Sequence, residues 1–347
     1  MTAKGRLVDA AVVGAGSWGT ALAHLLHRNG HRVRLWSYEK DLARSIKELG
    51  ENRSYLPGIA FPPDIRVSNQ LDEVVSGAEL IISVSPAQFV DRVMREAAPA
   101  VDPGALVVSA SKGIEMSTLR RMDEVLEEIL SPQAAKRLVV LSGPSFASEV
   151  ARGQPTAIVA ASRSAEARLE VQRVFRSPTF RVYTNPDVVG VGLGGALKNV
   201  IALAAGVCAG LDFGHNTQAA LLTRGLAEIT RLGVAMGAKP STFYGLAGIG
   251  DLVLTCTGKL SRNRMVGMRL GRGESLETIL SEMTAVVEGV RTTSAAHGLA
   301  KSFDVEMPIV RQVYAILKEG KAPRDAVRDL MLRDPRSESD STVEISR

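Results

Sequence analysis

Three glycines near the N-terminus have the spacing Gly14-x-Gly16-x-x-Gly19, after a short apolar run and before a helical pattern. Gly14 permits a tight turn, Gly16 lets backbone N–H groups approach a pyrophosphate, and Gly19 lets the helix pack closely on the strand. The helix start then presents its unpaired N–H groups to the anion. A second apolar run at 32–36 follows at the distance that a strand–helix–strand unit requires. This context predicts a dinucleotide site rather than a glycine-rich turn without a ligand.

Lys198 and Asn199 interrupt a long stretch of apolar and small residues at 189–208. A buried lysine is costly unless it is paired or functional. Desolvation lowers the pKa of a lysine, which suits proton transfer to or from a reacting oxygen. We therefore expect Lys198 to be catalytic. The alternative is that its apolar stem carries the ammonium out to water.

Two polar turns follow predicted strands. Ser111-Lys112-Gly113 comes after the run at 105–109, and the turn 142–147, which contains Gly143 and Ser145, comes after the run at 138–141. Ligands of open parallel sheets bind beyond the carboxyl ends of the strands, so both turns are candidate contacts. A surface lysine and an ordinary turn are the alternatives.

The second half of the chain offers a candidate phosphate receptor. Arg262 and Asn263 lie near a predicted helix start, which combines forked donors, an amide and a helix dipole. Asp251 closes the nearby motif Gly-Ile-Gly-Asp. Ser261 could instead be a plain helix N-cap and Arg262 a solvated helix residue.

The elements that must position these residues change in kind near residue 188. Before it, apolar runs that predict strands alternate with helical patterns, which indicates a mostly parallel sheet with right-handed crossovers. The predicted strands are 9–13, 32–36, 80–84, 105–109, 138–141, 156–160 and 179–183, and the predicted helices are 71–77, 88–98, 119–130 and 165–175. After it, the predicted helices are 189–208, 217–236, 263–270, 275–283, 289–301, 308–318 and 323–332.

The predicted fold class is therefore α/β. A Rossmann-like dinucleotide-binding domain with a mostly parallel sheet occupies 1–187, an all-helical substrate domain occupies 188–333, and a polar, disordered tail occupies 334–347. The apolar stretch 189–208 is predicted to be a buried helix, because Lys198-Asn199 and several glycines argue against a membrane span.

Composition excludes several classes of protein. The chain has 347 residues and 45% apolar residues, which suits a globular protein of two domains. The net charge of +5 comes from scattered basic residues without an aromatic ladder, so we expect no nucleic-acid partner. Cys208 and Cys256 form no metal-spaced pair, and we expect reduced thiols and no metal. The N-terminus lacks the apolar segment of a signal peptide, and the expected location is cytoplasmic.

Taken together, the motifs resemble the bacterial NAD(P)-dependent glycerol-3-phosphate dehydrogenases, in order from about residue 10 to about residue 330. The matching segments are 14–23 (GAGSWGTALA), 52–58 (NRSYLPG), 111–115 (SKGIE), 141–147 (LSGPSFA), 195–200 (GALKNV), 248–252 (GIGDL), 261–263 (SRN) and 287–290 (VEGV).

The resemblance implies hydride transfer between NAD(P)H and dihydroxyacetone phosphate, giving sn-glycerol 3-phosphate for phospholipid synthesis, in a chain that could be a homodimer. It implies that Lys198 is the proton donor and acceptor. The substrate contacts that it implies are Lys112, Gly143, Ser145, Lys198, Asp251, Ser261, Arg262 and Asn263. The cofactor contacts are Gly14, Gly16, Ser17, Trp18, Gly19, Tyr38, Tyr55, Lys112, Ala147, Arg262, Val286 and Glu288. Asp251 is also expected to orient Lys198.

Two segments depart from the family pattern. The chain reads Val84-Ser85-Pro86 where family members often have Val-Pro-Ser or Val-Pro-Thr, and Tyr38-Glu39 where many have a basic residue. An acid just past the second strand accepts hydrogen bonds from the ribose of NAD and repels the extra phosphate of NADP. Nearby basic residues could offset Glu39, or its side chain could point to solvent. We therefore expect both cofactors to be accepted, with weak discrimination.

Two other functions share part of this pattern. A β-hydroxyacid or phosphogluconate dehydrogenase has a similar domain pair and a catalytic lysine but takes a carboxylate substrate. A non-catalytic nicotinamide sensor is the second, and the joint presence of Lys198, Asp251 and Arg262 argues against it.

Overall fold

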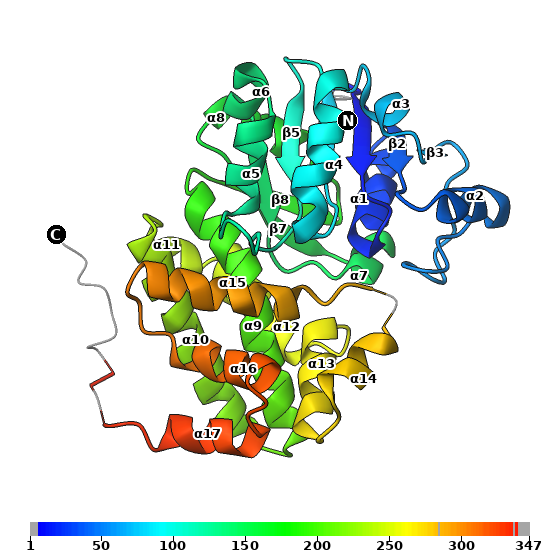
Figure 1. Cartoon of the computed structure of the whole chain (residues 1–347). Helices are drawn as coiled ribbons and strands as arrows, with labels where there is room; N and C mark the ends of the chain where they lie inside the picture. Colours follow the sequence, from blue (N-terminus) through cyan, green and yellow to red (C-terminus); the bar gives the residue numbers. More distant parts are fainter. Residues whose placement is uncertain (1–5, 284, 336, 339–347) are drawn as a thin grey trace. The chain divides into compact units, whose positions relative to one another are not determined.

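The computed structural model describes residues 6–283, 285–335 and 337–338, and Figure 1 shows its helices and strands. The chain forms two compact units. The sheet unit contains the described residues up to Ser111 together with Met122–Val188. The helical unit contains Lys112–Arg121 and the described residues from Val189 onward. Most of the predicted tail at 334–347 lies outside the described residues.

The described part of the sheet unit contains one sheet of eight strands, in the order β3-β2-β1-β4-β5-β6-β7-β8. Its strands are β1 (Asp9–Val13), β2 (Arg32–Trp36), β3 (Arg66–Ser68), β4 (Leu80–Ser83), β5 (Leu106–Ser109), β6 (Val139–Ser142), β7 (Thr156–Ala161) and β8 (Phe180–Asn185). Each pair is parallel except β6 and β7, which are antiparallel. The predicted mostly parallel sheet is confirmed. The short edge strand β3 was not predicted.

Helices cover both faces of this sheet, and each face has its own apolar core. Val12 and Ile82 point into one core with Leu22 of α1 (Ser17–Arg28), and their neighbours Val13 and Ile81 point into the other with Met94 of α4 (Val90–Ala97). The helices are α1 (Ser17–Arg28), α2 (Lys40–Leu49), α3 (Leu71–Val75), α4 (Val90–Ala97), α5 (Met122–Ile129), α6 (Pro132–Lys136), α7 (Ala147–Ala151) and α8 (Ala165–Phe175). Strand side chains alternate between the two faces, so a sheet buried on both sides reads as continuous apolar runs.

The helix predicted at 119–130 begins three residues later than expected. Leu119 has a left-handed backbone with φ of 59°, and Ile114 forms an isolated bridge with Arg121, so helix α5 starts only at Met122. The segment Lys112–Arg121 belongs to the helical unit, although the sequence places it within the first domain. Ile114 is fully buried in the helical core, and this anchors the segment there.

The helical unit surrounds one buried helix, α9 (Val188–Gly210), whose length and composition would also suit a membrane span. Because 89% of its most apolar window is buried inside the protein, we assign it as a core helix. The other helices are α10 (His215–Ala235), α11 (Pro240–Phe243), α12 (Asp251–Thr257), α13 (Arg262–Gly271), α14 (Leu276–Ser281), α15 (Glu288–Ser302), α16 (Pro308–Lys318) and α17 (Pro323–Met331).

Glycines bring α9 and α13 into backbone contact. A Cβ on Gly206 would lie 2.1 Å from the carbonyl oxygen of Arg264, and one on Gly267 would lie 2.0 Å from that of Leu203. The same close fit recurs one turn further on at Gly210 and Gly271. Only residues without a side chain allow this approach, which fixes the polar residues of α9 relative to those of α13.

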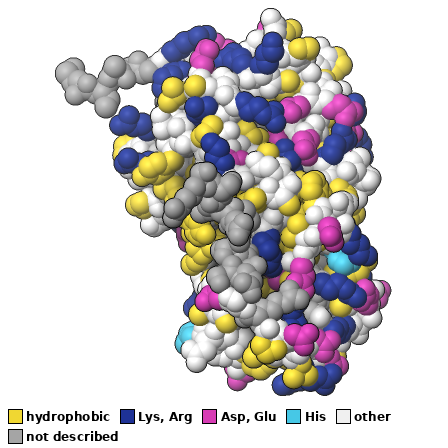
Figure 2. Space-filling model, turned by 90° about the vertical axis from the view of Figure 1, so that its left-hand side faces the viewer, with side chains coloured by type: hydrophobic (Ala, Val, Ile, Leu, Met, Phe, Trp, Pro, Cys, Tyr) yellow, Lys and Arg dark blue, Asp and Glu magenta, His cyan; other side chains and the backbone are white. Residues whose placement is uncertain are grey.

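Charged side chains of both signs are interspersed on the face shown in Figure 2. On this face the distribution agrees with the scattered charge of the sequence.

Candidate active site

Lys198 is buried in α9, and its ammonium is held inside the helical unit. Its Nζ donates to Oδ1 of Asp251 and, at 2.8 Å, to Oγ1 of Thr255. The lysine is 7% exposed and Asp251 is 1% exposed. These contacts exclude the alternative in which the stem of Lys198 carries the charge to water.

Lys112 completes this cluster from the segment that joins the helical unit. Its Nζ donates to the second carboxylate oxygen, Oδ2 of Asp251, at 2.8 Å. One buried carboxylate therefore binds two ammonium groups, and these three side chains together carry a net charge of +1, with Lys198 and Asp251 buried and Lys112 partly exposed. A cluster of this charge attracts an anion or a developing alkoxide.

The environment shifts the pKa of both central groups. Burial lowers the pKa of Lys198 to about 8, with Asp251 opposing the shift and Lys112 adding to it. Burial alone would raise the pKa of Asp251, but the charges of Lys112 and Lys198 outweigh it and the pKa is lowered. At neutral pH the cluster therefore holds an ionised carboxylate and a protonated Lys198 that gives up its proton more readily than an ordinary lysine.

Thr255 is a member of the cluster that sequence reasoning missed. Its hydroxyl donates to the backbone oxygen of Asp251 at 2.7 Å and accepts from Lys198. Asp251 opens α12 directly after a π-helical turn at Leu246–Gly250, and Thr255 lies one turn further along the same helix. The spacing of four residues puts both side chains on one helix face, and this is the signal that could have identified Thr255.

A second polar network joins three helices. Nδ2 of Asn263 donates to Oδ1 of Asn199 at 2.9 Å, and Oδ1 of Asn263 accepts from the backbone N–H of Gly289 at 3.0 Å. Asn199 had been noted only as a neighbour of Lys198, and the network gives it a structural role. Much of the hydrogen-bonding capacity of Asn263 is therefore used within the fold.

The predicted phosphate receptor lies at the start of α13. The hydroxyl of Ser261 accepts from the backbone N–H of Arg264 at 3.2 Å. Ser261 is therefore the N-cap of α13, which was the alternative to a role in phosphate binding. Arg262 is the first residue of the helix and is exposed. Val286 and Glu288 also belong to the helical unit, and Glu288 is the first residue of α15.

The three glycines of the N-terminal motif have the roles that their spacing predicts. Gly14 has φ of 133°, and a Cβ there would lie 3.0 Å from backbone atoms of Val84 and Ser85. A Cβ on Gly19 would lie 1.8 Å from the carbonyl oxygen of Gly14, so only glycine permits this contact between helix and strand. A Cβ on Gly16 would meet no atom within 4 Å. The strand order reverses between β1 and β4, which is where open α/β sheets bind ligands.

Other predicted cofactor residues adjoin this cradle. Ser17 opens α1 and donates to the backbone oxygen of Tyr55 at 2.5 Å. Trp18 packs with Ala147 against one small apolar cluster, and within the described residues its buried Nε1–H has no hydrogen-bond partner. A left-handed glycine, an open space over Gly16 and an unpaired donor fit a bound dinucleotide.

Gly143 and Ser145 lie in the sheet unit, in the turn after β6. Gly143 has φ of 134°, and the hydroxyl of Ser145 donates to its carbonyl oxygen at 3.0 Å. The hydroxyl of Ser142, at the end of β6, is buried without a partner among the described residues. The predicted site residues are therefore divided between the two units.

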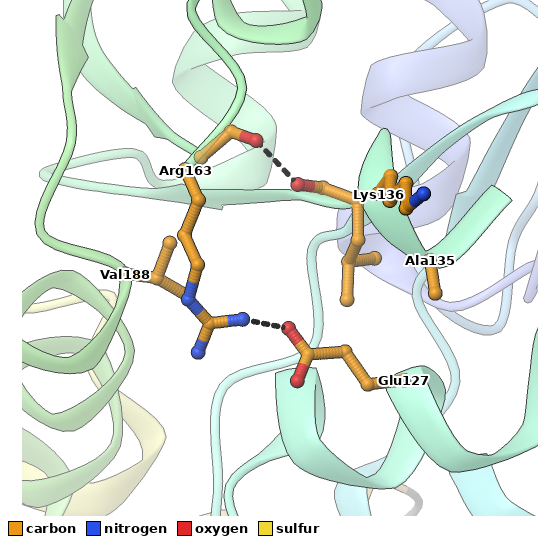
Figure 3. A pocket seen from close by; sticks show the side chains of 7 residues that line it. Glu127, Ala135, Lys136, Arg163 and Val188 are labelled. Carbon is orange, nitrogen blue, oxygen red and sulfur yellow. Dashed lines mark hydrogen bonds and ion pairs between the residues drawn. The ribbon is translucent and has the colours of Figure 1, made fainter. Parts of the chain in front are cut away.

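A hollow of about 280 Å³ lies elsewhere in the sheet unit, and Figure 3 shows its lining. Arg163 points toward Glu127 there and forms an ion pair with it. None of the predicted site residues lines this hollow. Among the described residues, no group of His, Cys, Asp or Glu side chains is arranged to hold a metal ion. Burial raises the pKa of Cys208 to about 11 and that of Cys256 to about 12, so neither is a reactive thiolate.

A dinucleotide cradle in one unit and a buried lysine–carboxylate cluster in the other define the class of nicotinamide-dependent dehydrogenases. Family models of NAD-dependent glycerol-3-phosphate dehydrogenase match residues 9–168 with the N-terminal part and residues 187–328 with the C-terminal part. The chain belongs to this family.

Relatives and solved structures agree with this assignment. The chain is 55% identical over 327 residues to glycerol-3-phosphate dehydrogenase (NAD(P)+) of Geobacter metallireducens, covering 94% of this chain and 98% of the relative. The enzyme of the same description from Geobacter sulfurreducens is 54% identical with the same coverage. The crystal structure of glycerol-3-phosphate dehydrogenase from Coxiella burnetii superposes with a TM-score of 0.90 at 39% identity, covering 94% of this chain and 99% of that one.

Proposed function

We propose that this chain is an NAD(P)-dependent oxidoreductase that interconverts dihydroxyacetone phosphate and sn-glycerol 3-phosphate. Its family and its relatives support this reaction. The observation that carries the proposal is the buried cluster in which Asp251 binds Lys112 and Lys198. A reduction of a carbonyl needs a proton donor beside a group that stabilises negative charge, and the cluster contains both.

Lys198 is the proton donor in this proposal. When bound, the reduced nicotinamide supplies the hydride, and the carbonyl oxygen of the substrate gains negative charge. Lys198 gives its proton to that oxygen, and the excess charge that Lys112 brings to the cluster stabilises the alkoxide before protonation. Asp251 holds both ammonium groups, so their positions are set before the substrate arrives.

The substrate phosphate is assigned to the start of α13. Arg262 offers forked charged donors, and the positive end of the helix dipole of α13 adds to the attraction. Ser261 and Asn263 contribute from the same turn, and Gly143 and Ser145 contact the substrate from the sheet unit. Binding energy from the phosphate, which does not react, is available to orient the carbonyl carbon.

The cofactor is assigned first to the glycine cradle and its neighbours. Gly16 and the start of α1 receive the pyrophosphate, and Trp18, Tyr38, Tyr55 and Ala147 contribute from the sheet unit. The contacts assigned from the helical unit are Lys112, Arg262, Val286 and Glu288. In the cell we assign the enzyme to the cytoplasm, as a homodimer that supplies phospholipid synthesis.

The experiment that tests the reaction is a spectrophotometric assay of NADH and NADPH oxidation. We expect turnover with dihydroxyacetone phosphate and at least about 100-fold lower kcat/KM with the keto acids that β-hydroxyacid dehydrogenases reduce, which lack the phosphate. A preference for the keto acids would assign the chain to that other class of dehydrogenase. Nucleotide binding without turnover of either substrate class would indicate a sensor.

The phosphate assignment has its own test in Arg262→Ala. We expect kcat/KM for dihydroxyacetone phosphate to fall by about 2–4 kcal/mol in free energy, because a charge-assisted anchor is lost. The loss should be much smaller for dihydroxyacetone or glyceraldehyde. Arg272→Ala, at the other end of α13, is the matched control and should change neither value. Equal losses on substrates with and without phosphate would remove Arg262 from the phosphate site.

A further inference from the structure

Arg92 lies against two aromatic rings at the end of the sheet that the adenosine half of a dinucleotide occupies. Its Cζ lies 5.3 Å from the centre of the Tyr38 ring and 5.5 Å from that of Phe89. Tyr38 follows strand β2, and Phe89 and Arg92 follow strand β4. Carboxyl ends of neighbouring parallel strands meet at one edge, and β2 and β4 flank β1 there.

The Tyr38 ring, on which the Arg92 guanidinium stacks, is itself held in place by Trp36. The ring of Tyr38 meets Trp36 edge to face, with centroids 6.1 Å apart, and Nε1 of the buried Trp36 donates to the backbone oxygen of Asn69 at 3.2 Å. Tyr38 itself is 65% exposed. Stacking on aromatic rings holds an arginine in a fixed plane and leaves its N–H groups available at the edge.

Arg92 has no ion-pair partner among the residues that the structure describes. In the described part of the chain no carboxylate lies within ion-pair distance of it, although Asp91, the preceding residue, pairs with Arg95. The exposed stack of Arg92 on Tyr38 and Phe89 therefore presents a cation beside the end of β2. The loop between β2 and α2, residues 37–39, contains no basic residue, and the next one, Lys40, opens α2.

Glu39, the residue after Tyr38 in the loop that follows β2, carries a negative charge opposite to that of Arg92. Glu39 accepts from the hydroxyl of Tyr55 at 3.2 Å and from that of Ser37 at 3.4 Å, so its carboxylate is held in place. A hollow of about 350 Å³ is lined by Glu39, Asp41, Leu42, Ser45, Ser54 and Tyr55. A fixed carboxylate of this kind accepts hydrogen bonds from ribose hydroxyls and repels a phosphate.

We propose that Arg92 is the residue that recognises the 2′-phosphate of NADP, in opposition to Glu39, which favours the free ribose of NAD. The cation that selects NADP thus comes from α4 rather than from the loop after β2. Tyr38 and Phe89 orient the guanidinium for a forked contact with the phosphate. This inference rests on the proposed function for the nucleotide but not for the second substrate.

Calorimetric titration of the full-length chain with adenosine 2′,5′-bisphosphate and with 5′-AMP tests the proposal. The two ligands differ only in the 2′-phosphate. Arg92→Ala should weaken binding of the bisphosphate at least tenfold and that of 5′-AMP less than threefold. The ratio of kcat/KM for NADPH to that for NADH should fall at least tenfold in the same variant.

Arg95→Ala is the matched control, since Arg95 lies one turn further along α4 and pairs with Asp91 and Glu128. It should leave the ratio of the two affinities unchanged. An Arg92→Ala variant that loses both ligands equally, or neither, overturns the proposal. Selective loss of the bisphosphate in a chain that does not reduce dihydroxyacetone phosphate would leave this inference standing and remove the proposed reaction.

Discussion

Glycines serve opposite purposes in the two units. In the sheet unit a Cβ on Gly16 would meet no protein atom within 4 Å, so the position is open toward a ligand. In the helical unit a Cβ on Gly206 would lie 2.1 Å from the backbone of α13. The same residue type thus opens a surface in one unit and closes a core in the other. In the proposed function the cofactor binds at the open backbone of the glycine cradle, whereas the core of the helical unit positions the reactive side chains.

The two units also differ in whether the polar side chains of their candidate site regions have hydrogen-bond partners. In the helical unit Lys198, Asp251 and Thr255 satisfy one another. In the sheet unit the indole N–H of Trp18 is buried without a partner among the described residues, as are the hydroxyls at the ends of three neighbouring strands, Ser83, Ser109 and Ser142. The reactive side chains of the helical unit are therefore positioned before a substrate binds. The sheet unit instead retains unused hydrogen-bonding groups at the carboxyl ends of its strands.

The largest effect is expected from Lys198→Ala. Loss of the proton donor should lower kcat for the reduction about 10²–10⁴-fold, the usual value of general acid catalysis. Lys112 still neutralises Asp251 in this variant, so the helical unit should keep its fold. Steady-state kinetics with saturating cofactor and a circular dichroism spectrum check both statements. A variant with near-normal turnover would remove Lys198 from the mechanism.

Gly206→Ala tests the close backbone contact between α9 and α13 in the core of the helical unit. The added methyl group would overlap the backbone of α13, and we expect a loss of about 1–3 kcal/mol in unfolding free energy. Gly16→Ala is the matched control, since its methyl group would enter open space. Urea unfolding curves measure both changes. Equal midpoints for the two variants would contradict the contrast between the units.

The pH profile of the reaction tests whether burial already lowers the pKa of Lys198 before the substrate binds. Because the pKa of Lys198 is lowered to about 8, kcat/KM for the reduction should be constant below pH 8 and fall tenfold per pH unit above it. The reverse oxidation needs the neutral amine, so its rate should rise up to pH 8 and then level off. Thr255→Val removes an acceptor of the ammonium and should move the inflection to lower pH. An inflection near the ordinary lysine value would show that burial does not tune this group.

Glu39→Arg is expected to have the smallest effect of these changes. Replacing a carboxylate held near the ribose by a cation should shift the ratio of kcat/KM toward NADPH by about tenfold, which corresponds to about 1.4 kcal/mol. Steady-state kinetics with both cofactors measure the ratio. If the ratio does not move, Glu39 lies outside the ribose pocket, and cofactor selection in the sheet unit depends on other residues.

Local patterns in the sequence predicted the cradle and most of the fold. The roles of Gly14 and Gly19 follow from their spacing, because strand, turn and helix are neighbours in the chain. The antiparallel pairing of β6 and β7 did not follow, since an apolar run indicates burial but not direction. The three-residue strand β3 is too short to show a period.

The helical site was predicted in part. The contact of Asp251 with Lys198 was expected from the family pattern and is present in the structure. The position of Lys112 in the helical unit depends on the burial of Ile114 among helices that come much later in the chain, and no local pattern contains that information. The link from Asn199 through Asn263 to Gly289 also joins distant segments through packing alone.

The most direct test of the division between the units is a crossed measurement on Gly16→Ala and Lys198→Ala. The dissociation constant of NADH and the kcat at saturating cofactor are measured for both variants. We expect Gly16→Ala to weaken NADH binding at least about tenfold, because its methyl group occupies the space of the pyrophosphate, with kcat changed less than about threefold. Lys198→Ala should bind NADH with nearly normal affinity and lose about 10²–10⁴-fold in kcat. If both variants lose affinity and turnover together, the separation of backbone binding in the sheet unit from side-chain chemistry in the helical unit is wrong.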